Sequence, residues 1–306
     1  MSSENIDPIA LVAEFGIRAS QATRAPHSNL AAVYIIDDAY VLRARHLSRS
    51  LDDILKNERE LLVAVRRLFS IKFPELLSAQ KGKKYIAEGA NAWTLYPLIQ
   101  GDTLCGWTEL YYALDPDQWK RVFSFMRDLH EKTQGRIPLS EPRHGFARDV
   151  EKRLANVGDS ISNFARTRIQ RAIERVAEYE IRRTERCFVH GDIHPGNMIF
   201  SKGEITGLID VDWCRAGLDL EDLAYLVMMA VRDYRKPCFE TLDRDFFENC
   251  LNQYGLHQTD RSILDEYMVL YTLYDLDLFF STPQMSKRSF FVEYQRGMVE
   301  KLCLTL

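Results

Sequence analysis

Apolar and polar positions in the first fifty residues predict a short helix followed by two paired strands. After Asp7-Pro8, apolar residues recur as on one face of a helix, which is expected to end at Gly16. Ala32–Ile36 and Tyr40–Ala44 are apolar runs on either side of Asp37-Asp38. Because aspartates of this kind favour turns, the pattern predicts an antiparallel hairpin.

A longer helix is predicted over Ser50–Phe69, where apolar residues follow i, i+3, i+4 spacing. Glu58 lies on the apolar stripe itself, which indicates a buried partner, although a solvated position at the edge of the stripe is the alternative. Two short strands, Glu75–Ala79 and Lys84–Glu88, and a third apolar run, Asn91–Ile99, are expected to complete a small sheet.

The remainder of the chain has mainly helical spacing. A helix capped at Asp115 is expected to run to Lys132, and Gly145–Arg186 reads as mostly helical with interleaved charges, which is typical of a solvated surface. A further helix follows over Leu223–Val231. Near the end of the chain, aromatic and acidic residues have two interpretations. They form helical core, which is the preferred interpretation, or they line an acceptor pocket. These residues are Tyr267, Tyr271, Tyr274, Asp275, Asp277, Phe279 and Phe280.

Cys187–Asp212 has the densest concentration of candidate chemistry. Phe188-Val189 predicts a short buried strand, and His190–Asn197 is almost entirely polar, glycine or proline, so it predicts a loop. Apolar residues on either side of Lys202-Gly203 predict a hairpin that returns the chain to the loop. Asp192, Asn197 and Asp210 are therefore expected to lie close together.

These three side chains suit phosphoryl transfer from a nucleotide. In this interpretation Asp192 orients or deprotonates an acceptor hydroxyl, while Asn197 and Asp210 hold Mg²⁺ against the phosphates, with Asp212 as an assistant. Asn197 follows Asp192 by five positions, the spacing of the catalytic loop H-R-D-x-x-x-x-N of protein kinases. An ordinary loop followed by a strand-end aspartate is the competing interpretation.

The segment H-G-D-I-H-P-G-N, followed by L-I-D-V-D, resembles the aminoglycoside phosphotransferase and choline kinase-like family of small-molecule kinases. Gly191 stands where protein kinases have arginine. The resemblance implies an α+β, two-lobed protein kinase-like fold, with a small antiparallel β N-lobe and a larger, mainly helical C-lobe. We expect residues 1–98 to form the N-lobe, which binds the nucleotide. Residues 99–306 are expected to form the C-lobe, which carries the catalytic and acceptor sites.

The resemblance also implies a basic residue that reaches the nucleotide phosphates, here Arg43, where protein kinases have lysine. Arg45, two residues further on the same strand face, is the alternative. In the family a helix glutamate pairs with this base, so Glu58 is expected to pair with Arg43. Glu60 is the weaker candidate because it points about 200° away on the helix.

Two further nucleotide contacts follow from the resemblance alone. The loop that covers the phosphates corresponds to residues 26–29, including Ser28 and Asn29, and it lacks the glycines of many relatives. The adenine is expected to bond to the Pro97 carbonyl and the Ile99 amide.

Three other polar residues are expected to have structural roles. His190 is predicted to orient the catalytic loop by hydrogen bonding, and His130 to be a satisfied structural histidine. Asp222, in a segment that resembles the family's G-x-P-x-x-D-L-A, is predicted to begin a helix and brace the loop.

Composition narrows the class of protein. The 306 residues have a net charge of −4, which does not suggest nucleic-acid binding. The N-terminus lacks signal-peptide features, and no apolar run reaches the roughly 18 residues of a membrane span. The six cysteines are scattered without metal-ligand spacing, so free thiols in a reducing cytoplasm are expected.

Together these observations predict a cytoplasmic kinase that uses ATP or GTP with Mg²⁺ to phosphorylate a hydroxyl of a small molecule. The resemblance places aminoglycosides and amino-alcohols among the candidate acceptors. One alternative is a bacterial protein Ser/Thr kinase on the same scaffold. The other is a catalytically silent nucleotide-binding module, which the glycine-free loop and Arg43 favour and which intact Asp192, Asn197 and Asp210 oppose. The sequence does not indicate the oligomeric state.

Overall fold

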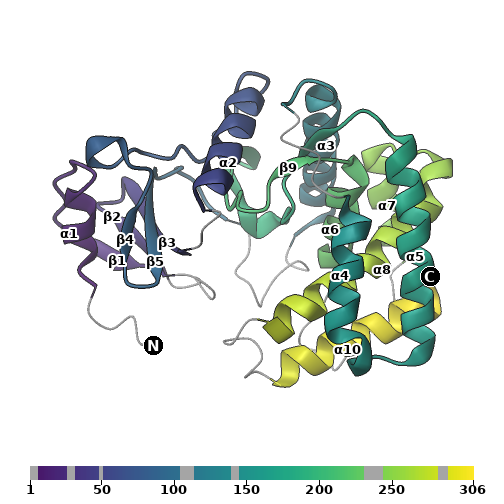
Figure 1. The fold of residues 1–306 in the computed structure, drawn as a ribbon. Coiled ribbons are helices and arrows are strands. Elements are labelled where there is room, and N and C mark those ends of the chain that lie inside the picture. Colours follow the sequence, from purple (N-terminus) through teal and green to yellow (C-terminus); the bar gives the residue numbers. More distant parts are fainter. Residues whose placement is uncertain are drawn as a thin grey trace.

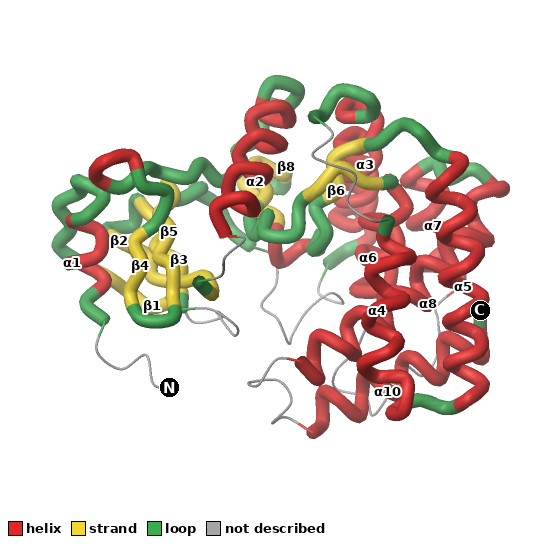
Figure 2. Tube along the Cα trace, in the orientation of Figure 1, coloured by secondary structure: helices red, strands yellow, loops and turns green. Residues whose placement is uncertain are grey.

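Residues 6–25, 32–47, 51–103, 114–138, 145–230, 244–281 and 289–306 are described by the computed structural model. The chain forms two lobes, a small one rich in strands and a large one that is mainly helical (Figure 1). Figure 2 shows the difference by colour, with most of the yellow strands on one side and most of the red helices on the other. This arrangement confirms the predicted two-lobed α+β architecture.

The small lobe is an antiparallel five-stranded sheet with the order β1-β2-β3-β5-β4. Its elements are α1 (Pro8–Ala13), β1 (Ala22–Arg24), β2 (Val33–Ile36), β3 (Tyr40–His46), α2 (Leu51–Arg66), β4 (Ile86–Glu88) and β5 (Asn91–Pro97). One face of the sheet packs on α1 through buried apolar residues that include Leu11, Leu42 and Trp93. The predicted short helix and hairpin are therefore confirmed.

The β2–β3 hairpin sets the direction of two basic side chains. Asp37 and Asp38 have φ angles of 46° and 49°, the left-handed conformation that a two-residue hairpin turn requires. Since side chains alternate along a strand, Arg43 and Arg45 in β3 leave the sheet on the same face. That face is turned toward α2 and residues 210–212, since Arg45 contacts Glu58 and Arg43 contacts Asp210 and Asp212.

One predicted strand is absent. Glu75–Ala79 is not in a strand, and within it only the Leu77 N–H bonds to β5, at the Leu95 carbonyl over 2.9 Å. The chain then turns through a short 3₁₀ segment at Gln80–Gly82. A single bond cannot form a ladder, so the apolar run supplies packing for the sheet instead of another strand.

The large lobe is built on helices that surround one continuous core. Its helices are α3 (Pro116–Thr133), α4 (Phe146–Val157), α5 (Asn163–Arg182), α6 (Asp219–Ala230), α7 (Arg244–Tyr254), α8 (Gln258–Ser281) and α10 (Ser289–Thr305). The predicted cap of α3 is present. The Asp115 carboxylate accepts a hydrogen bond from the Gln118 N–H over 2.8 Å, and the Gln118 side-chain oxygen accepts one from the Asp115 N–H.

Two small strand pairs carry the polar loops of the large lobe. They are β6 (Cys187–Val189) with β9 (Arg215–Gly217), and β7 (Met198–Ser201) with β8 (Glu204–Leu208). A backbone bridge from Lys72 to Gly207 joins the second pair to the segment after α2, and a bridge from Asp102 to Phe200 joins it to the segment after β5. The predicted hairpin around Lys202-Gly203 is confirmed.

Helix α2 contributes to the cores of both lobes. Leu51 and Leu55 pack with Ala92 of β5, while Leu61, Leu62 and Val65 belong to the core of the large lobe. In Figure 1 the helix lies between the two lobes. Glu58 is between these two sets of contacts and is 4% exposed, so it is buried as predicted.

The described thiols are reduced, and no described helix is long and apolar enough to cross a membrane. Cys187, Cys214, Cys250 and Cys303 are buried, and none of them is in a disulfide. Cys105 and Cys238 lie outside the described residues.

Glu180, on α5, is a buried carboxyl that should make stability depend on pH. Burial and the nearby Glu221 raise the pKa of Glu180 from an ordinary value of 4.5 to about 7. The folded chain therefore binds more protons than the unfolded chain between those values, and stability should fall as pH rises through that window. In Glu180→Gln this carboxyl no longer titrates, so the decrease in the free energy of unfolding between low and high pH should be smaller by up to about 3 kcal/mol.

Urea unfolding near pH 5 and near pH 8 measures the effect. Glu178→Gln, on the exposed face of the same helix, is the matched control and should keep the wild-type pH dependence. An unchanged pH dependence in Glu180→Gln would show that another group titrates.

Candidate active site

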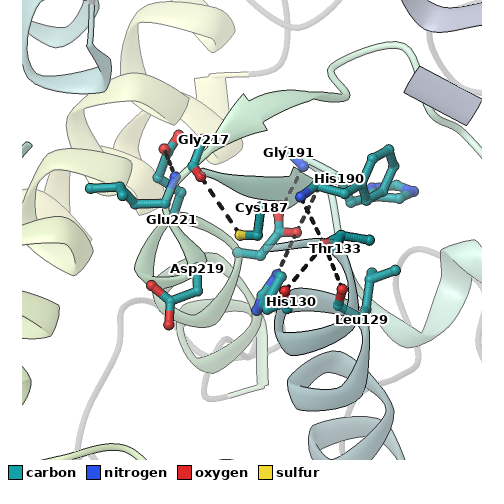
Figure 3. A network of polar contacts seen from close by, with 12 residues as sticks. Leu129, His130, Thr133, Cys187, His190, Gly191, Gly217, Asp219 and Glu221 are labelled. Atoms are coloured by element: carbon teal, nitrogen blue, oxygen red, sulfur yellow. Dashed lines mark hydrogen bonds and ion pairs between the residues drawn. The ribbon is translucent and has the colours of Figure 1, made fainter. Parts of the chain in front are cut away.

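The loop after β6 is fixed by a buried carboxylate on α6. The His190 and Gly191 N–H groups donate to Asp222 over 2.7 and 2.8 Å. Figure 3 shows both residues at the end of β6, within a polar network that also includes His130 and Thr133. Asp222 is fully buried, and although burial opposes it, the side-chain hydrogen bond from His130, together with the backbone bond from His190, lowers the pKa of Asp222. The prediction that Asp222 braces this loop is confirmed, but the prediction that it begins the helix is wrong, because α6 begins three residues earlier at Asp219.

Gly191 is required by the conformation of the loop. Its φ is +81°, and a Cβ there would lie 2.7 Å from the Trp213 carbonyl oxygen and 2.8 Å from the Trp213 Cβ. Any larger residue would displace the segment that follows Asp212. This contact gives a physical reason why glycine replaces the arginine of protein kinases.

Both histidines of interest have structural hydrogen bonds. His190 Nε2 bonds to the Ile209 carbonyl over 2.9 Å, and its Nδ1 faces the Asp192 N–H at 3.3 Å. His130 lies between the Tyr254 hydroxyl, at 2.7 Å, and Asp222, at 3.3 Å. Each imidazole is buried and bonded at both nitrogens, as the sequence predicted.

The Asp192 carboxylate is oriented from two sides. Asn197 Nδ2 donates to its Oδ2 over 3.1 Å and to its main-chain carbonyl over 2.8 Å, and the Tyr225 hydroxyl donates to Oδ1 over 2.7 Å. Burial and the charge of Asp210 raise the pKa of Asp192. A carboxylate held in this way, with a raised proton affinity, is suited to accept a hydroxyl proton.

Asp210 follows β8 in a strained conformation, with φ of +60°. The preceding residue, Ile209, donates its N–H to the Asn197 carbonyl over 2.9 Å, which ties Asp210 to the catalytic loop. Although burial opposes it, Arg43 lowers the pKa of Asp210. The carboxylate is therefore ionised at neutral pH, as a metal ligand needs to be.

Arg43 and Arg45 both reach across from β3 to the acidic residues. Arg43 bonds to Asp210 and Asp212 over 2.9 Å each, and Arg45 bonds to Asp212 over 2.8 Å. The Glu58 carboxylate pairs with Arg45, over 3.0 Å. The expected pairing of Glu58 with Arg43 is therefore wrong, because Arg45 is the arginine within reach of this part of α2.

The polar groups of the site fit a magnesium nucleotide. Asn197 uses its amide nitrogen within the loop. Its amide oxygen is the kind of ligand atom that Mg²⁺ prefers. In the described chain, the buried Nε atoms of Arg43 and Arg45 have no hydrogen-bond partner, so each guanidinium keeps a donor suited to phosphate. Among the described residues, no group of three or more His, Cys, Asp or Glu side chains could hold a metal by itself.

The other predicted nucleotide contacts stay predictions. Ser28 and Asn29 lie outside the described residues. Pro97 ends β5 and pairs in register with Tyr40. The Ile99 side chain lies so close to Gly207 that a Cβ there would be 2.6 Å from it. Both residues are thus at the connection between the lobes, where the adenine is expected.

Tyr225 and Trp213 are site residues that the sequence analysis did not find. Tyr225 is three residues after Asp222 and therefore on the same side of α6. That spacing was a usable signal once Asp222 was placed against the loop. Trp213 follows Asp212 directly, and its contact with Gly191 depends on the path of the chain after β8.

Residues 22–260 match the model of the phosphotransferase enzyme family, and the chain belongs to that family. It is an ATP-dependent phosphotransferase with a protein kinase-like fold, of the class that acts on hydroxyl groups. No curated protein matches the sequence.

Solved structures with a similar fold cover nearly the whole chain. The GDP and kanamycin complex of APH(2")-IIia has a TM-score of 0.66 at 15% identity, and the match covers 94% of this chain and 96% of the chain in that structure. Amicoumacin kinase hAmiN has a TM-score of 0.64 at 16% identity, with coverages of 92% and 88%. APH(3'')-Id from Streptomyces rimosus, in complex with ADP and streptomycin, has a TM-score of 0.61 at 18% identity, with coverages of 86% and 96%.

Proposed function

We propose that this protein transfers the γ-phosphoryl group of ATP, or of GTP, to a hydroxyl of a small molecule in the cytoplasm. The observation that carries the proposal is the joint placement of Asp192 and Asp210. The Asn197 side chain donates to the Asp192 carboxylate, and the Asn197 carbonyl accepts from the N–H of Ile209, the residue before Asp210. Arg43 bonds to Asp210. The family and the fold support nucleotide-dependent phosphoryl transfer as the reaction, and we assign these residues to that reaction.

In this proposal Asp192 orients the acceptor hydroxyl and takes its proton. The acceptor oxygen forms a bond to the γ-phosphorus while the bond to the β–γ bridging oxygen breaks, and the nucleoside diphosphate leaves with the displaced electron pair. Asn197 and Asp210 are the residues that would hold Mg²⁺, which neutralises phosphate charge when it is bound. Arg43 exchanges part of its contact with Asp210 for the phosphates, and Arg45 keeps Glu58 and Asp212 in place.

Tyr225→Phe tests the orientation of Asp192 separately from its chemistry. The change removes one hydrogen bond to a carboxylate and keeps the aromatic ring, so kcat should fall about tenfold while the KM for nucleotide stays the same. Steady-state kinetics with the best acceptor measures both constants. Tyr179→Phe is the control, since its hydroxyl faces Asp260, at 3.4 Å, away from the loop.

Release of ADP or GDP in the presence of Mg²⁺ tests the proposed function. We expect slow hydrolysis without an acceptor, and faster release with one member of a panel of hydroxylated amines, sugars and antibiotics. Aminoglycosides and amino-alcohols belong in the panel, since kanamycin and streptomycin are named in complexes of similar structures. Transfer of radiolabel to protein instead of a small molecule, or nucleotide binding without any turnover, would contradict the proposal.

A further inference from the structure

The large lobe contains a cavity that is separate from the active site. It has a volume of about 430 Å³ and lies where the C-terminal ends of α3, α5 and α7 meet the start of α6. Its most buried lining residues include Cys187, Leu218 and Tyr254, each no more than 6% exposed. Asp192 is not among the residues that line it. A cavity of this size can hold a small molecule, and we call it the helix-end cavity.

The helix-end cavity adjoins the network that braces the catalytic loop. Tyr254, in its lining, contacts His130 over 2.7 Å. His130 lies 3.3 Å from Asp222, whose carboxylate holds the backbone of the loop. Figure 3 shows part of this network, with the Asp219 carboxylate turned away from the end of β6. A molecule in the cavity would thus reach the network without reaching Asp192, so it would be an effector and not the phosphoryl acceptor.

The Tyr254 hydroxyl has one proton and two acceptors. It lies 2.7 Å from His130 Nδ1 and 3.2 Å from Asp219 Oδ2. Asp222 is ionised, because its pKa is lowered, so it accepts from His130 Nε2. In the neutral imidazole Nδ1 then has only a lone pair, and the Tyr254 proton cannot serve both His130 and Asp219 at once. One of these two acceptors is therefore short of a donor.

The arginines that line the helix-end cavity each have a carboxylate partner. The pairs are Arg127 with Glu131, at 4.0 Å, Arg182 with Glu178, at 3.4 Å, and Arg183 with Asp260, at 3.0 Å. Two other lining carboxylates have only neutral donors among the described residues, since Glu185 accepts from Gln134 and Asp219 accepts from Tyr254. The His257 imidazole is exposed at the mouth. The lining therefore has an excess of negative charge, and Asp219 is the more buried of the two carboxylates without a cation.

The surroundings of Asp219 favour an organic cation. Burial raises the pKa of both Cys187 and Tyr254, and after burial the largest cause for each is the charge of Asp219, to which Asp222 adds. The carbonyl ends of α3, α5 and α7 contribute partial negative charge, which the start of α6 opposes. Among the described residues, no group of three or more His, Cys, Asp or Glu side chains could hold a metal ion. An ammonium, which needs fewer ligands and donates hydrogen bonds, fits better.

We infer that the helix-end cavity binds a small organic ammonium, which donates to Asp219 and activates the kinase through Tyr254 and His130. The ammonium supplies the donor that the pair of acceptors lacks, so the Tyr254 hydroxyl donates to His130 at all times. His130 is then held in the orientation that bonds to Asp222, which orders the catalytic loop. The activation rests on the proposed function, whereas the binding does not.

Titration calorimetry of the full-length protein with three probes of similar shape tests the binding. The probes are benzylamine, benzyl alcohol and benzoate, which are cationic, neutral and anionic at neutral pH. Benzylamine should bind at least about tenfold more tightly than either of the others, because only the ammonium offers a charged donor to Asp219. Equal binding of the three probes, tighter binding of the alcohol or of benzoate, or no detectable binding of benzylamine would overturn the inference.

Four variants locate the bound amine. Asp219→Asn keeps the shape of the side chain and should abolish the preference for benzylamine, while Tyr254→Phe should bind it at least as tightly as the wild type. Asp192→Asn should leave its affinity unchanged, as should the matched control Asp128→Asn on α3, outside the cavity. Binding of a nucleotide analogue shows that each variant is folded. Unchanged binding in Asp219→Asn, or loss of binding in Asp192→Asn, would place the amine elsewhere and contradict the assignment.

Nucleotide turnover tests the link to the catalytic loop. Saturating benzylamine should raise kcat for ADP release about fivefold in the wild type, the low end for coupling between two sites. Tyr254→Phe should bind the amine but lose the activation, and Asp219→Asn should lose both. Unchanged or lower turnover with the amine bound, or activation retained in Tyr254→Phe, would refute the inferred coupling. Absence of turnover under every condition would overturn the proposed function instead, while calorimetry would still decide the binding.

Discussion

Asp192→Ala should lower kcat by about a thousandfold and leave the affinity for Mg²⁺-nucleotide close to that of the wild type. A positioned general base contributes on the order of 10²–10⁴ in rate, and this carboxylate is held on both oxygens by Asn197 and Tyr225. Nucleotide affinity should be spared, because the contacts assigned to phosphate and metal come from Arg43, Asn197 and Asp210. Single-turnover kinetics and equilibrium nucleotide titration measure the two quantities.

Asp128→Ala is the matched control for this experiment. Asp128 is a half-exposed aspartate on α3 that pairs with Lys132 over 3.1 Å, and its loss should change neither kcat nor affinity. Near-normal turnover in Asp192→Ala would remove Asp192 from the role of base. A parallel loss of nucleotide binding would show instead that the change disturbs the metal site.

Arg45→Met should destabilise the folded protein by about 4 kcal/mol. The side chains of Arg45 and Glu58 are 8% and 5% exposed, so removing the guanidinium leaves a carboxylate buried without a partner. Breaking one member of a buried ion pair typically costs about 3–5 kcal/mol. Burial already raises the pKa of Glu58 against the effect of Arg45, so Glu58 is expected to take up a proton in the variant. Urea unfolding measures the loss.

The double variant Arg45→Met/Glu58→Leu completes the test. It replaces both charges by apolar groups and should recover most of the stability, because no unpaired charge remains. Lys132→Met, which breaks the exposed pair with Asp128, should change stability by no more than about 0.5 kcal/mol. If the double variant were no more stable than Arg45→Met, the ion pair would not explain the loss.

Local patterns were sufficient to predict much of the fold and the catalytic loop. Asp37-Asp38 specifies a turn through its own backbone preferences, and the apolar spacing of α2 specifies a buried face. The link between Asp222 and the loop followed from a motif within forty residues. Each of these features depends on neighbours in sequence, so no distant contact had to be known.

Features decided by the packing of distant segments could not be predicted in the same way. Arg43 and Arg45 leave β3 on one face, and only the rotation and distance of α2 decide which of them meets Glu58. Glu75–Ala79 is apolar enough for a strand, but a strand needs an available edge along its length. The ring contacts of Tyr225 in α6 with Tyr271 in α8, and of Trp213 after β8 with Tyr274 in α8, arise only from the tertiary fold.

Helix α2 has a consequence for attempts to divide the protein. Its 16 residues extend over about 24 Å, with one end in each hydrophobic core and Glu58 between them. If the chain were cut near residue 98, the fragment with the strands would expose Leu61, Leu62 and Val65, and the helical fragment would lose them from its interior. Neither half should then fold to an intact nucleotide site, so expression trials should keep the two halves in one polypeptide.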